Sequence, residues 1–498
     1  MLRKLLILSS TLLAMSGTAY AQYNPAASCS IGPTEFQSWF KGGAILKNGA
    51  VTFADSIAFP ENNTKCDFYK WGHQMFLWIT SPVGGGINIT SAQFYNVNFI
   101  NDQGVYIQGD DTGVLKGDKT GKMTGMRASV NTKLLKGLQA DTIQPGGQAG
   151  GSDGLMSING SLVYYAVHTN DVYAWFNTAV SNGVIPGTAP FPNTKQDRDA
   201  VTAYAKKNGV TLNDADALTV EIKTSWIDAA KVNGDLADYV VITADVPNYV
   251  GAVGDKTWTI SQTQPTITKR IALVGMHVVG TVKGHPEMVW ATFEHKANAP
   301  NDSYALSVQQ PGFEPQTVTV PYNSSGKWNF MQTNGTQDGA LVAQMKVNDD
   351  GGISATPGNA IQPNNTYRVH AWGGPSDASS ANNNTQLVTL NENIDFMLAN
   401  TPNGKDVRSN YVQVGGVWTS NGSIPSNASD NVAQVGSLLL ANATMETYHQ
   451  KTGQGIIPAF QNGCFGCHNT GTTKKNPTPP PTAISHLFSA SNVPLVPK

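Results

Sequence analysis

The sequence predicts a β-rich protein of the α+β class, in which strands outnumber helices and most helices are short. Glycine makes up 50 of the 498 residues, and charged residues make up only 13%. A chain of this kind, which is also rich in Asn, Thr and Ser, favours turns and strands over long charged helices. We expect one large β-rich body, residues 22–436, and a short C-terminal tail, residues 437–498.

The strands are predicted from short apolar segments bounded by turn residues. Short strands broken by turns are expected from residue 67 to residue 155, with a glycine-rich loop at residues 146–154. In residues 219–225 apolar side chains alternate with Glu221 and Lys223, as in a half-buried strand. The remaining predicted strands are residues 238–245, 270–282, 288–295 and 366–372.

Helices are predicted where a capping residue precedes an apolar face and a glycine follows it. Asn170 is expected to be the N-cap of a helix that ends at Gly183, and Gly209 is expected to stop a second helix over residues 195–207. Two further helices are predicted at residues 385–399 and 437–450.

The N-terminus has the pattern of a secretory signal peptide. Arg3 and Lys4 form a basic start, residues 5–15 are largely apolar, and residues 19–21 (Ala-Tyr-Ala) supply a small-x-small cleavage pattern. The apolar stretch is shorter than the roughly 20 residues that a membrane-spanning helix needs, and no later segment is apolar for long enough. We therefore expect residues 1–21 to be removed and the mature protein to be exported, to the periplasm or to the cell exterior.

Two of the four cysteines, Cys29 and Cys66, lie near the N-terminus of the predicted body. In an oxidising compartment, two otherwise unpaired cysteines are usually joined. We therefore predict a disulfide between them. A lipid anchor on Cys29 is less favoured, because the apolar region ends well before it.

Five residues near the C-terminus, Cys464-Phe465-Gly466-Cys467-His468, match the attachment signature of a c-type haem. Two thiols at this spacing reach both vinyl groups of one porphyrin, and the adjacent histidine binds its iron. A thioredoxin-type redox pair would need a βαβ context, and a closed zinc site would need further ligands. We predict one covalent haem c, with His468 as an iron ligand. Such attachment takes place outside the bacterial cytoplasm, which agrees with the signal peptide.

The second axial ligand of the iron is the main open question. The segment after His468 opens with a polar, proline-rich stretch and contains no methionine, so it cannot fold as an ordinary small cytochrome c domain. The body must therefore cover the haem. Three candidates for the distal ligand are His277 in a predicted buried strand, Met445 on the helix before the motif, and His486 after it. A distal position left open to a substrate is the remaining alternative.

Several stretches together resemble a family of exported, single-haem bacterial proteins known only as "cytochrome c family protein". The resemblance implies a haem and an exported location, but it implies no particular reaction. It covers most of the mature chain. The matching stretches are residues 71–78 (WGHQMFLW), 153–165, 220–226 (VEIKTSW), 272–277 (ALVGMH), 286–295 (PEMVWATFEH), 440–448 (LANATMETY) and 464–468 (CFGCH).

A formal net charge of −2 argues against a nucleic acid or an anionic membrane as the main partner. The leading prediction is single-electron transfer with a redox partner protein or a small-molecule donor or acceptor. One alternative is a haem enzyme, peroxidase-like or oxygenase-like, with an open iron position. For that class, Glu287 and Glu294, near His285 and His295, are candidate proton-handling groups, although edge or surface positions are the favoured explanation of them. A third alternative is a binding module with an accessory haem.

Overall fold

The structure is a computed structural model. It describes residues 23–100, 106–110, 114–115, 122–123, 152–309, 312–375, 377–428, 430, 432–450, 463–474, 476–485 and 487. The predicted signal peptide and His486 lie outside this part of the chain, as does most of the predicted loop at residues 146–154.

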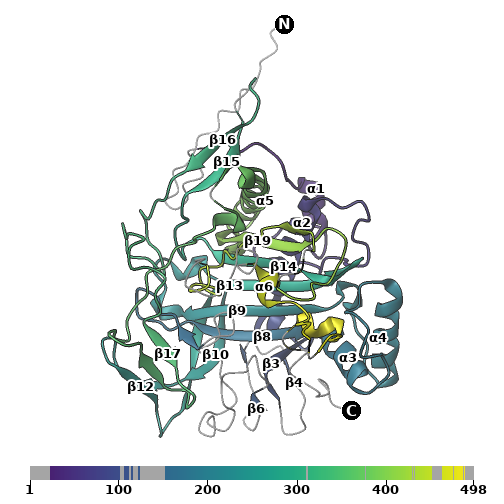
Figure 1. Cartoon of the computed structure of the whole chain (residues 1–498), viewed down its shortest axis with the longest axis horizontal. Coiled ribbons are helices and arrows are strands. Elements are labelled where there is room, and N and C mark those ends of the chain that lie inside the picture. The colour runs from purple at the N-terminus through teal and green to yellow at the C-terminus, as the bar shows by residue number, and fades with distance from the viewer. Residues whose placement is uncertain are drawn as a thin grey trace.

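A large, almost wholly antiparallel sheet forms the centre of the molecule (Figure 1). Its main path runs in the order β20-β19-β14-β13-β9-β8-β3-β4, and among the described residues its one parallel pairing joins β10 to β5. The strands are β3 (Phe94–Ile100), β4 (Tyr106–Gln108), β5 (Val114–Leu115), β6 (Lys122–Met123), β8 (Tyr164–Asn170), β9 (Val220–Asp228), β10 (Val241–Pro247), β13 (Thr266–Val282), β14 (His285–His295), β19 (Tyr411–Thr419) and β20 (Gln434–Gly436).

Three smaller sheets surround the central one. The largest of them joins five short strands beside one end of the central sheet, and the β15–β16 hairpin projects from the body at the top of Figure 1. The strands are β1 (Pro82–Val83) with β2 (Gly86–Ile87), β15 (Tyr304–Val308) with β16 (Gln316–Val320), and the five-stranded set β7 (Asp153–Gly154), β11 (Tyr249–Val250), β12 (Thr257–Ile260), β17 (Met345–Val347) and β18 (Ile353–Ala355).

Helices pack on both faces of the central sheet. One face forms a hydrophobic core with α1, α2 and α5, and the other packs against α3, α4 and the C-terminal tail with α6. The helices are α1 (Pro33–Ser38), α2 (Lys65–Ile79), α3 (Asp171–Ser181), α4 (Lys195–Lys207), α5 (Ala381–Ala399) and α6 (Cys464–Cys467). The 3-10 turns are η2 (Asn88–Thr90), η4 (Ala215–Ala217), η5 (Ala229–Lys231), η6 (Leu236–Asp238), η7 (Ala371–Gly373), η8 (Ala378–Ser380), η9 (Val407–Asn410) and η11 (Pro481–Ile484).

The β-rich α+β class is confirmed, and so are most of the predicted elements. Asn170 caps α3, because its side chain accepts a hydrogen bond from the Tyr173 backbone N–H at 3.1 Å. The predicted disulfide is present, with the sulfurs of Cys29 and Cys66 bonded. Among the described residues, no helix has the length and apolar character needed to cross a membrane.

Three secondary-structure predictions are wrong. Short strands were expected from residue 67 onward, but α2 occupies the start of that range and is buried on most of its surface, so it has no polar face to reveal its period. Residues 366–372 form no regular strand, because their backbone N–H groups bind separate partners such as Phe330 and Pro300. Residues 437–450 form turns rather than a helix. There the Asn442 side chain accepts from the backbone N–H groups of Thr444 and Met445 and so competes with helical hydrogen bonds.

Candidate haem site

The motif folds as one helical turn that ends at the histidine. Helix α6 is Cys464–Cys467, and the His468 backbone N–H donates to the Cys464 carbonyl at 2.7 Å. Residues three apart in a helix lie on the same side, so the two thiols share one side of the turn. Cys464 is half-buried and Cys467 is exposed. This local geometry suits two bonds to a single planar group.

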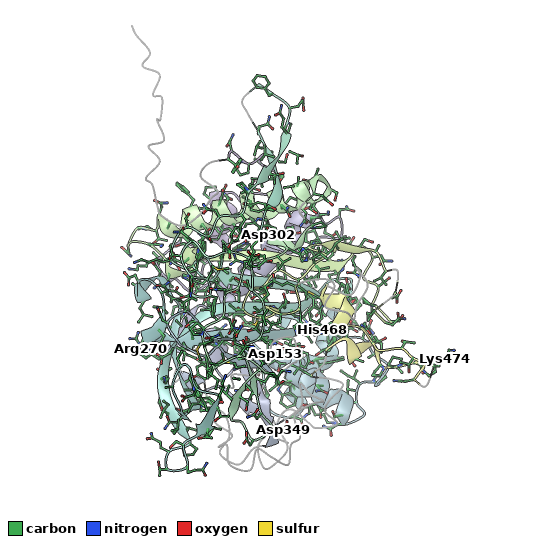
Figure 2. The ribbon with its side chains drawn as sticks, turned by 60° about the vertical axis from the view of Figure 1, so that its left-hand side comes forward. Asp153, Arg270, Asp302, Asp349, His468 and Lys474 are labelled. Atoms are coloured by element: carbon green, nitrogen blue, oxygen red, sulfur yellow. A yellow bond between two sulfur atoms is a disulfide. The ribbon has the colours of Figure 1, made fainter. Side chains whose placement is uncertain are left out.

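The His468 imidazole is oriented by two contacts. Its ring packs against the indole of Trp290, with 4.1 Å between ring centroids, and its Nδ1 lies 3.2 Å from the backbone oxygen of Ile484. Because a carbonyl oxygen can only accept, Nδ1 carries the hydrogen and the lone pair of the neutral ring belongs to Nε2. Histidines that bind a metal through Nε2 commonly have Nδ1 bonded in this way. Figure 2 labels His468 on the yellow tail, with Lys474 projecting from the body farther along.

The tail packs closely against the central sheet. Phe465, Ile484 and Leu487 belong to one hydrophobic cluster with residues of α3 and β14, including Trp290. The Trp290 indole N–H donates to the Glu287 carbonyl at 3.0 Å, which fixes the ring against which His468 packs. The yellow ribbon in Figure 1 lies across the sheet for this reason.

Beside the hydrophobic cluster that holds Trp290 and Phe465, the same face of the sheet carries a polar cluster, which we define as Glu221, Lys223, His277 and Glu446. Glu221 and Glu446 are buried, and Lys223 and His277 are half-buried. In the strand register Lys223 on β9 lies opposite His277 on β13, and Glu221 is two residues along β9 on the same face. His277 Nε2 lies 3.3 Å from Glu446 Oε1, but this approach lacks hydrogen-bond geometry, and Nε2 is buried. Glu446 reaches the cluster from the turns that precede the motif.

Burial dominates the protonation behaviour of the polar cluster. It raises the pKa of Glu446 to about 7, opposed by the Asn442 backbone N–H and by Lys223. Burial lowers the pKa of Lys223 to about 8 and, with the Lys223 charge, that of His277 to about 3. The pKa of each motif thiol is raised by burial and by the nearby Glu446 charge. Glu446 therefore lies near both thiols as well as near His277.

The three candidate distal residues have different surroundings. His277 faces the polar cluster, with a buried Nε2 that makes no hydrogen bond. Met445 is fully buried in a separate hydrophobic cluster with residues such as Phe330 and Val163, which contains neither Phe465 nor Cys464. His486 lies outside the described residues. Of the two candidates described, His277 is the one that belongs to the polar cluster.

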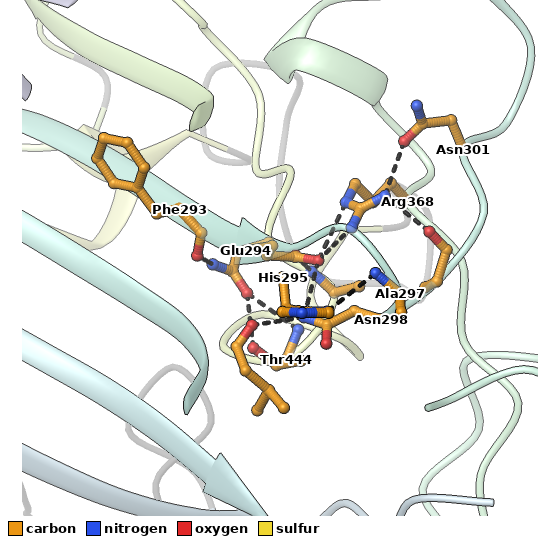
Figure 3. Close-up of polar contacts among 12 residues, drawn as sticks. Phe293, Glu294, His295, Ala297, Asn298, Asn301, Arg368 and Thr444 are labelled. Atoms are coloured by element: carbon orange, nitrogen blue, oxygen red, sulfur yellow. Dashed lines mark hydrogen bonds and ion pairs between the residues drawn. The ribbon is translucent and has the colours of Figure 1, made fainter. Parts of the chain in front are cut away.

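The acidic residues considered as proton-handling groups have structural partners. Glu294 forms a buried ion pair with Arg368, with Oε2 2.5 Å from Nη2, and also accepts from the Ala443 backbone N–H and the Asn298 side chain (Figure 3). Glu287 lies 2.9 Å from His285 Nδ1. Both carboxylates are buried, so an edge or surface position does not describe them. Glu294 instead anchors the turns that carry Glu446.

These residues fit a covalently attached haem on three observations. Both thiols lie on one side of a turn, His468 is oriented through Nδ1, and His277 has an unbonded buried Nε2 beside the carboxylate that influences both thiols. Among the described residues, no three His, Cys, Asp or Glu side chains are grouped so that they could hold a metal ion by themselves.

Sequence reasoning missed part of this site. Trp290, Ile484 and Ser485 were not identified as site residues, and neither were the roles of Glu221 and Lys223. One signal was available, because two charged residues alternate along a strand that was expected to be half-buried. The contribution of Glu446 had no such signal, since it depends on turns where a helix was predicted.

Searches against protein-family models, curated proteins and solved structures find no match to this chain. The resemblance to the single-haem family therefore stays a prediction.

Proposed function

We propose that this protein is an exported c-type cytochrome that holds one covalent haem and transfers single electrons. Cys464 and Cys467 would form the thioether bonds, and His468 would bind the iron through Nε2. The observation that carries this proposal is the Nδ1 contact of His468 with the Ile484 carbonyl, in a turn that also carries both thiols. When bound, haem c supplies reversible one-electron chemistry at its iron.

The surrounding chain supports this role through burial. Trp290 and Phe465 are almost fully buried and form the apolar seat of the motif. An apolar, water-poor environment favours the less charged state of a redox centre and excludes competing reactions with solvent. The tail packs against the central sheet, so the sheet face would provide the other wall.

His277 is the distal ligand that the geometry favours. A buried imidazole nitrogen without a hydrogen bond has a strong requirement for a partner, and an iron atom would provide one. Six-coordinate iron changes oxidation state with little rearrangement, which suits electron transfer. The protein would exchange electrons with a redox protein or a small-molecule donor or acceptor, outside the bacterial cytoplasm. The Cys29–Cys66 disulfide supports export, because such bonds persist in oxidising compartments.

One specific observation favours a second candidate, a haem enzyme with an open distal position. His277, Lys223 and Glu446 form a group of acids and bases beside the motif thiols. Side chains of this kind can move protons during the reduction of a small bound molecule. In that case His277 would act as an acid or base and would not bind iron.

The attachment proposal is tested by purifying the protein from a periplasm that attaches haem and recording reduced spectra. We expect a c-type α-band, haem that resists extraction by acidic acetone, and a mass higher by one haem. The variants Cys464→Ser and Cys467→Ser should lose one thioether each, while a Ser38→Ala control should keep both. A wild-type protein without covalent haem contradicts the proposal.

Exposure of the same protein to carbon monoxide and cyanide separates the two candidate functions. Indifference to both at neutral pH is expected of a six-coordinate electron carrier. Rapid formation of either adduct would instead favour the haem enzyme.

A further inference from the structure

A buried hydrogen-bonded chain leads from the sheet to the peptide that orients His468. The Ser485 hydroxyl donates to Glu221 Oε2 at 2.6 Å. The Tyr173 hydroxyl lies 2.8 Å from Ser485 Oγ. Because the single hydroxyl hydrogen of Ser485 goes to Glu221, Tyr173 is the donor in the second contact. The order of donation is therefore Tyr173 to Ser485 to Glu221.

The chain ends at the peptide unit that His468 contacts. The Ile484 carbonyl that accepts from His468 Nδ1 and the Ser485 backbone N–H belong to the same peptide group. That N–H donates to the Thr482 carbonyl at 3.1 Å. Rotation of the Ile484–Ser485 peptide is thus restrained by its own N–H and by the anchored serine side chain.

All three side chains in this hydrogen-bonded series are buried. Ser485 and Tyr173 are fully buried, and Glu221 is 7% exposed. A buried carboxylate is unfavourable unless hydrogen bonds or charges compensate for lost hydration. Glu221 has both forms of compensation, the Ser485 hydroxyl and the nearby Lys223 ammonium, and burial still raises its pKa to about 7. The proposed function gives this acidic side chain no role so far.

We propose that Glu221 is a positioning residue for His468, which acts through Ser485 to hold the Ile484 carbonyl and thereby tunes the reduction potential of the haem. This inference rests on the proposed function. A firm hydrogen bond from Nδ1 raises the basicity of a metal-bound imidazole. A more basic axial ligand stabilises the oxidised iron, so the Glu221 anchor keeps the potential lower than it would otherwise be.

The test uses the full-length holoprotein and three variants. Ser485→Ala removes the link and leaves the peptide. Glu221→Leu removes the carboxylate. Glu221→Gln keeps an oxygen that can accept from Ser485. Ile222→Val, on the same strand but the opposite face, is the matched control. For each we would measure the midpoint potential and the proton NMR signal of the His468 Nδ1–H.

We expect Ser485→Ala and Glu221→Leu to raise the midpoint potential and to move the Nδ1–H signal toward that of a weaker hydrogen bond. Glu221→Gln should restore most of the wild-type values, and Ile222→Val should change neither. Should Glu221→Leu fail to fold, Ser485→Ala still decides the question, because it removes only one hydroxyl.

Three results overturn the inference, and each has a different meaning. In the first, wild-type protein carries covalent haem, and the Ser485→Ala variant has the same midpoint potential and the same Nδ1–H signal as the wild type. The positioning role is then wrong, while the proposed cytochrome stands. If the variants lower only the unfolding temperature, Glu221 has a structural role alone. If wild-type protein attaches no haem, the proposed function fails, and this inference fails with it.

Discussion

His277 and Glu446 face each other across the sheet surface that carries the motif, with Nε2 and Oε1 3.3 Å apart and no hydrogen bond between them. We predict that replacing His277 with alanine removes the sixth iron ligand. A low-spin spectrum should then become high-spin, with a shifted Soret band and a changed midpoint potential. Absorption spectroscopy and a redox titration would measure these effects.

Met445→Leu provides the matched control, because it replaces the other described candidate with a residue of similar volume. It should leave the spectrum unchanged. A His277→Ala protein with an unaltered Soret band and potential would eliminate His277 as a ligand, and His486 would become the favoured candidate.

The Cys29–Cys66 disulfide is predicted to be a substantial source of stability. It closes a loop with a sequence separation of 37 residues, for which the chain-entropy estimate is about 4 kcal/mol. Thr389 on α5 also holds the segment around Cys29, because its hydroxyl donates to the Cys29 carbonyl at 2.9 Å. The double variant Cys29→Ser/Cys66→Ser should lower the free energy of unfolding in urea by about this amount.

Alkylation without reductant checks the bond itself. Intact-mass analysis should then find neither Cys29 nor Cys66 labelled. Labelling of both would contradict the disulfide.

The elements that sequence predicted well have local causes. Helix α3 follows from the Asn170 cap, and α4 from Thr194 and Asp197, which bond to each other's backbone N–H groups. Helix α2 was missed because both sides of it are buried, which removes the periodic signal. The helix predicted at residues 437–450 fails because tertiary partners such as Glu294 take its backbone N–H groups.

The candidate site divides in the same way. The attachment residues follow from one short motif, since the chemistry requires them to be adjacent. The orienting carbonyl of Ile484 and the polar cluster could not be predicted, because they depend on how β9, β13 and the tail come together. Sequence alone could rank His277 among the distal candidates, but it could not predict that Glu446 lies near His277.

Acid should destabilise the protein through His295. Burial lowers its pKa to about 3 from an ordinary 6.5. Its Nδ1 accepts from the Ala297 backbone N–H at 3.1 Å, so a proton there would face a donor. Between pH 6.5 and 3 the unfolded chain binds this proton and the folded protein does not. The contribution of His295 to the free energy of unfolding is therefore fully present above pH 6.5. It declines as the pH falls, by about 2 kcal/mol at pH 5.

A comparison with His295→Gln isolates this effect from the other buried groups. Between pH 7 and pH 5, the loss in free energy of unfolding should be about 2 kcal/mol smaller in the variant than in the wild type. Urea unfolding at both pH values measures it. An equal pH dependence in the two proteins would show that His295 is protonated in the folded state.

The Glu294–Arg368 ion pair should be strongly coupled. Arg368→Met leaves the Glu294 carboxylate buried without its cation, which should destabilise the protein by about 3–5 kcal/mol. The double variant Glu294→Gln/Arg368→Met should lose less than the sum of the two single variants, because no buried charge stays unpaired. Urea unfolding of the four proteins measures this coupling. Additive losses would mean that the two residues act independently.

Gly463 is predicted to be essential for seating the attachment turn. A Cβ atom at this position would lie 2.4 Å from the backbone oxygen of Leu438, and backbone atoms cannot move aside as a flexible side chain can. Gly463→Ala should therefore displace α6, and with it Cys464, from the apolar seat. Gly187→Ala is the control, since nothing lies within 4 Å of the added Cβ. Mass spectrometry should find less covalent haem per chain in Gly463→Ala than in the control, with nearly unchanged unfolding of the β-rich body, because the contact involves only the tail and one turn. Full haem loading of Gly463→Ala with a wild-type spectrum would show that the backbone at Leu438 can move aside. Close packing at Gly463 would then not determine the position of α6.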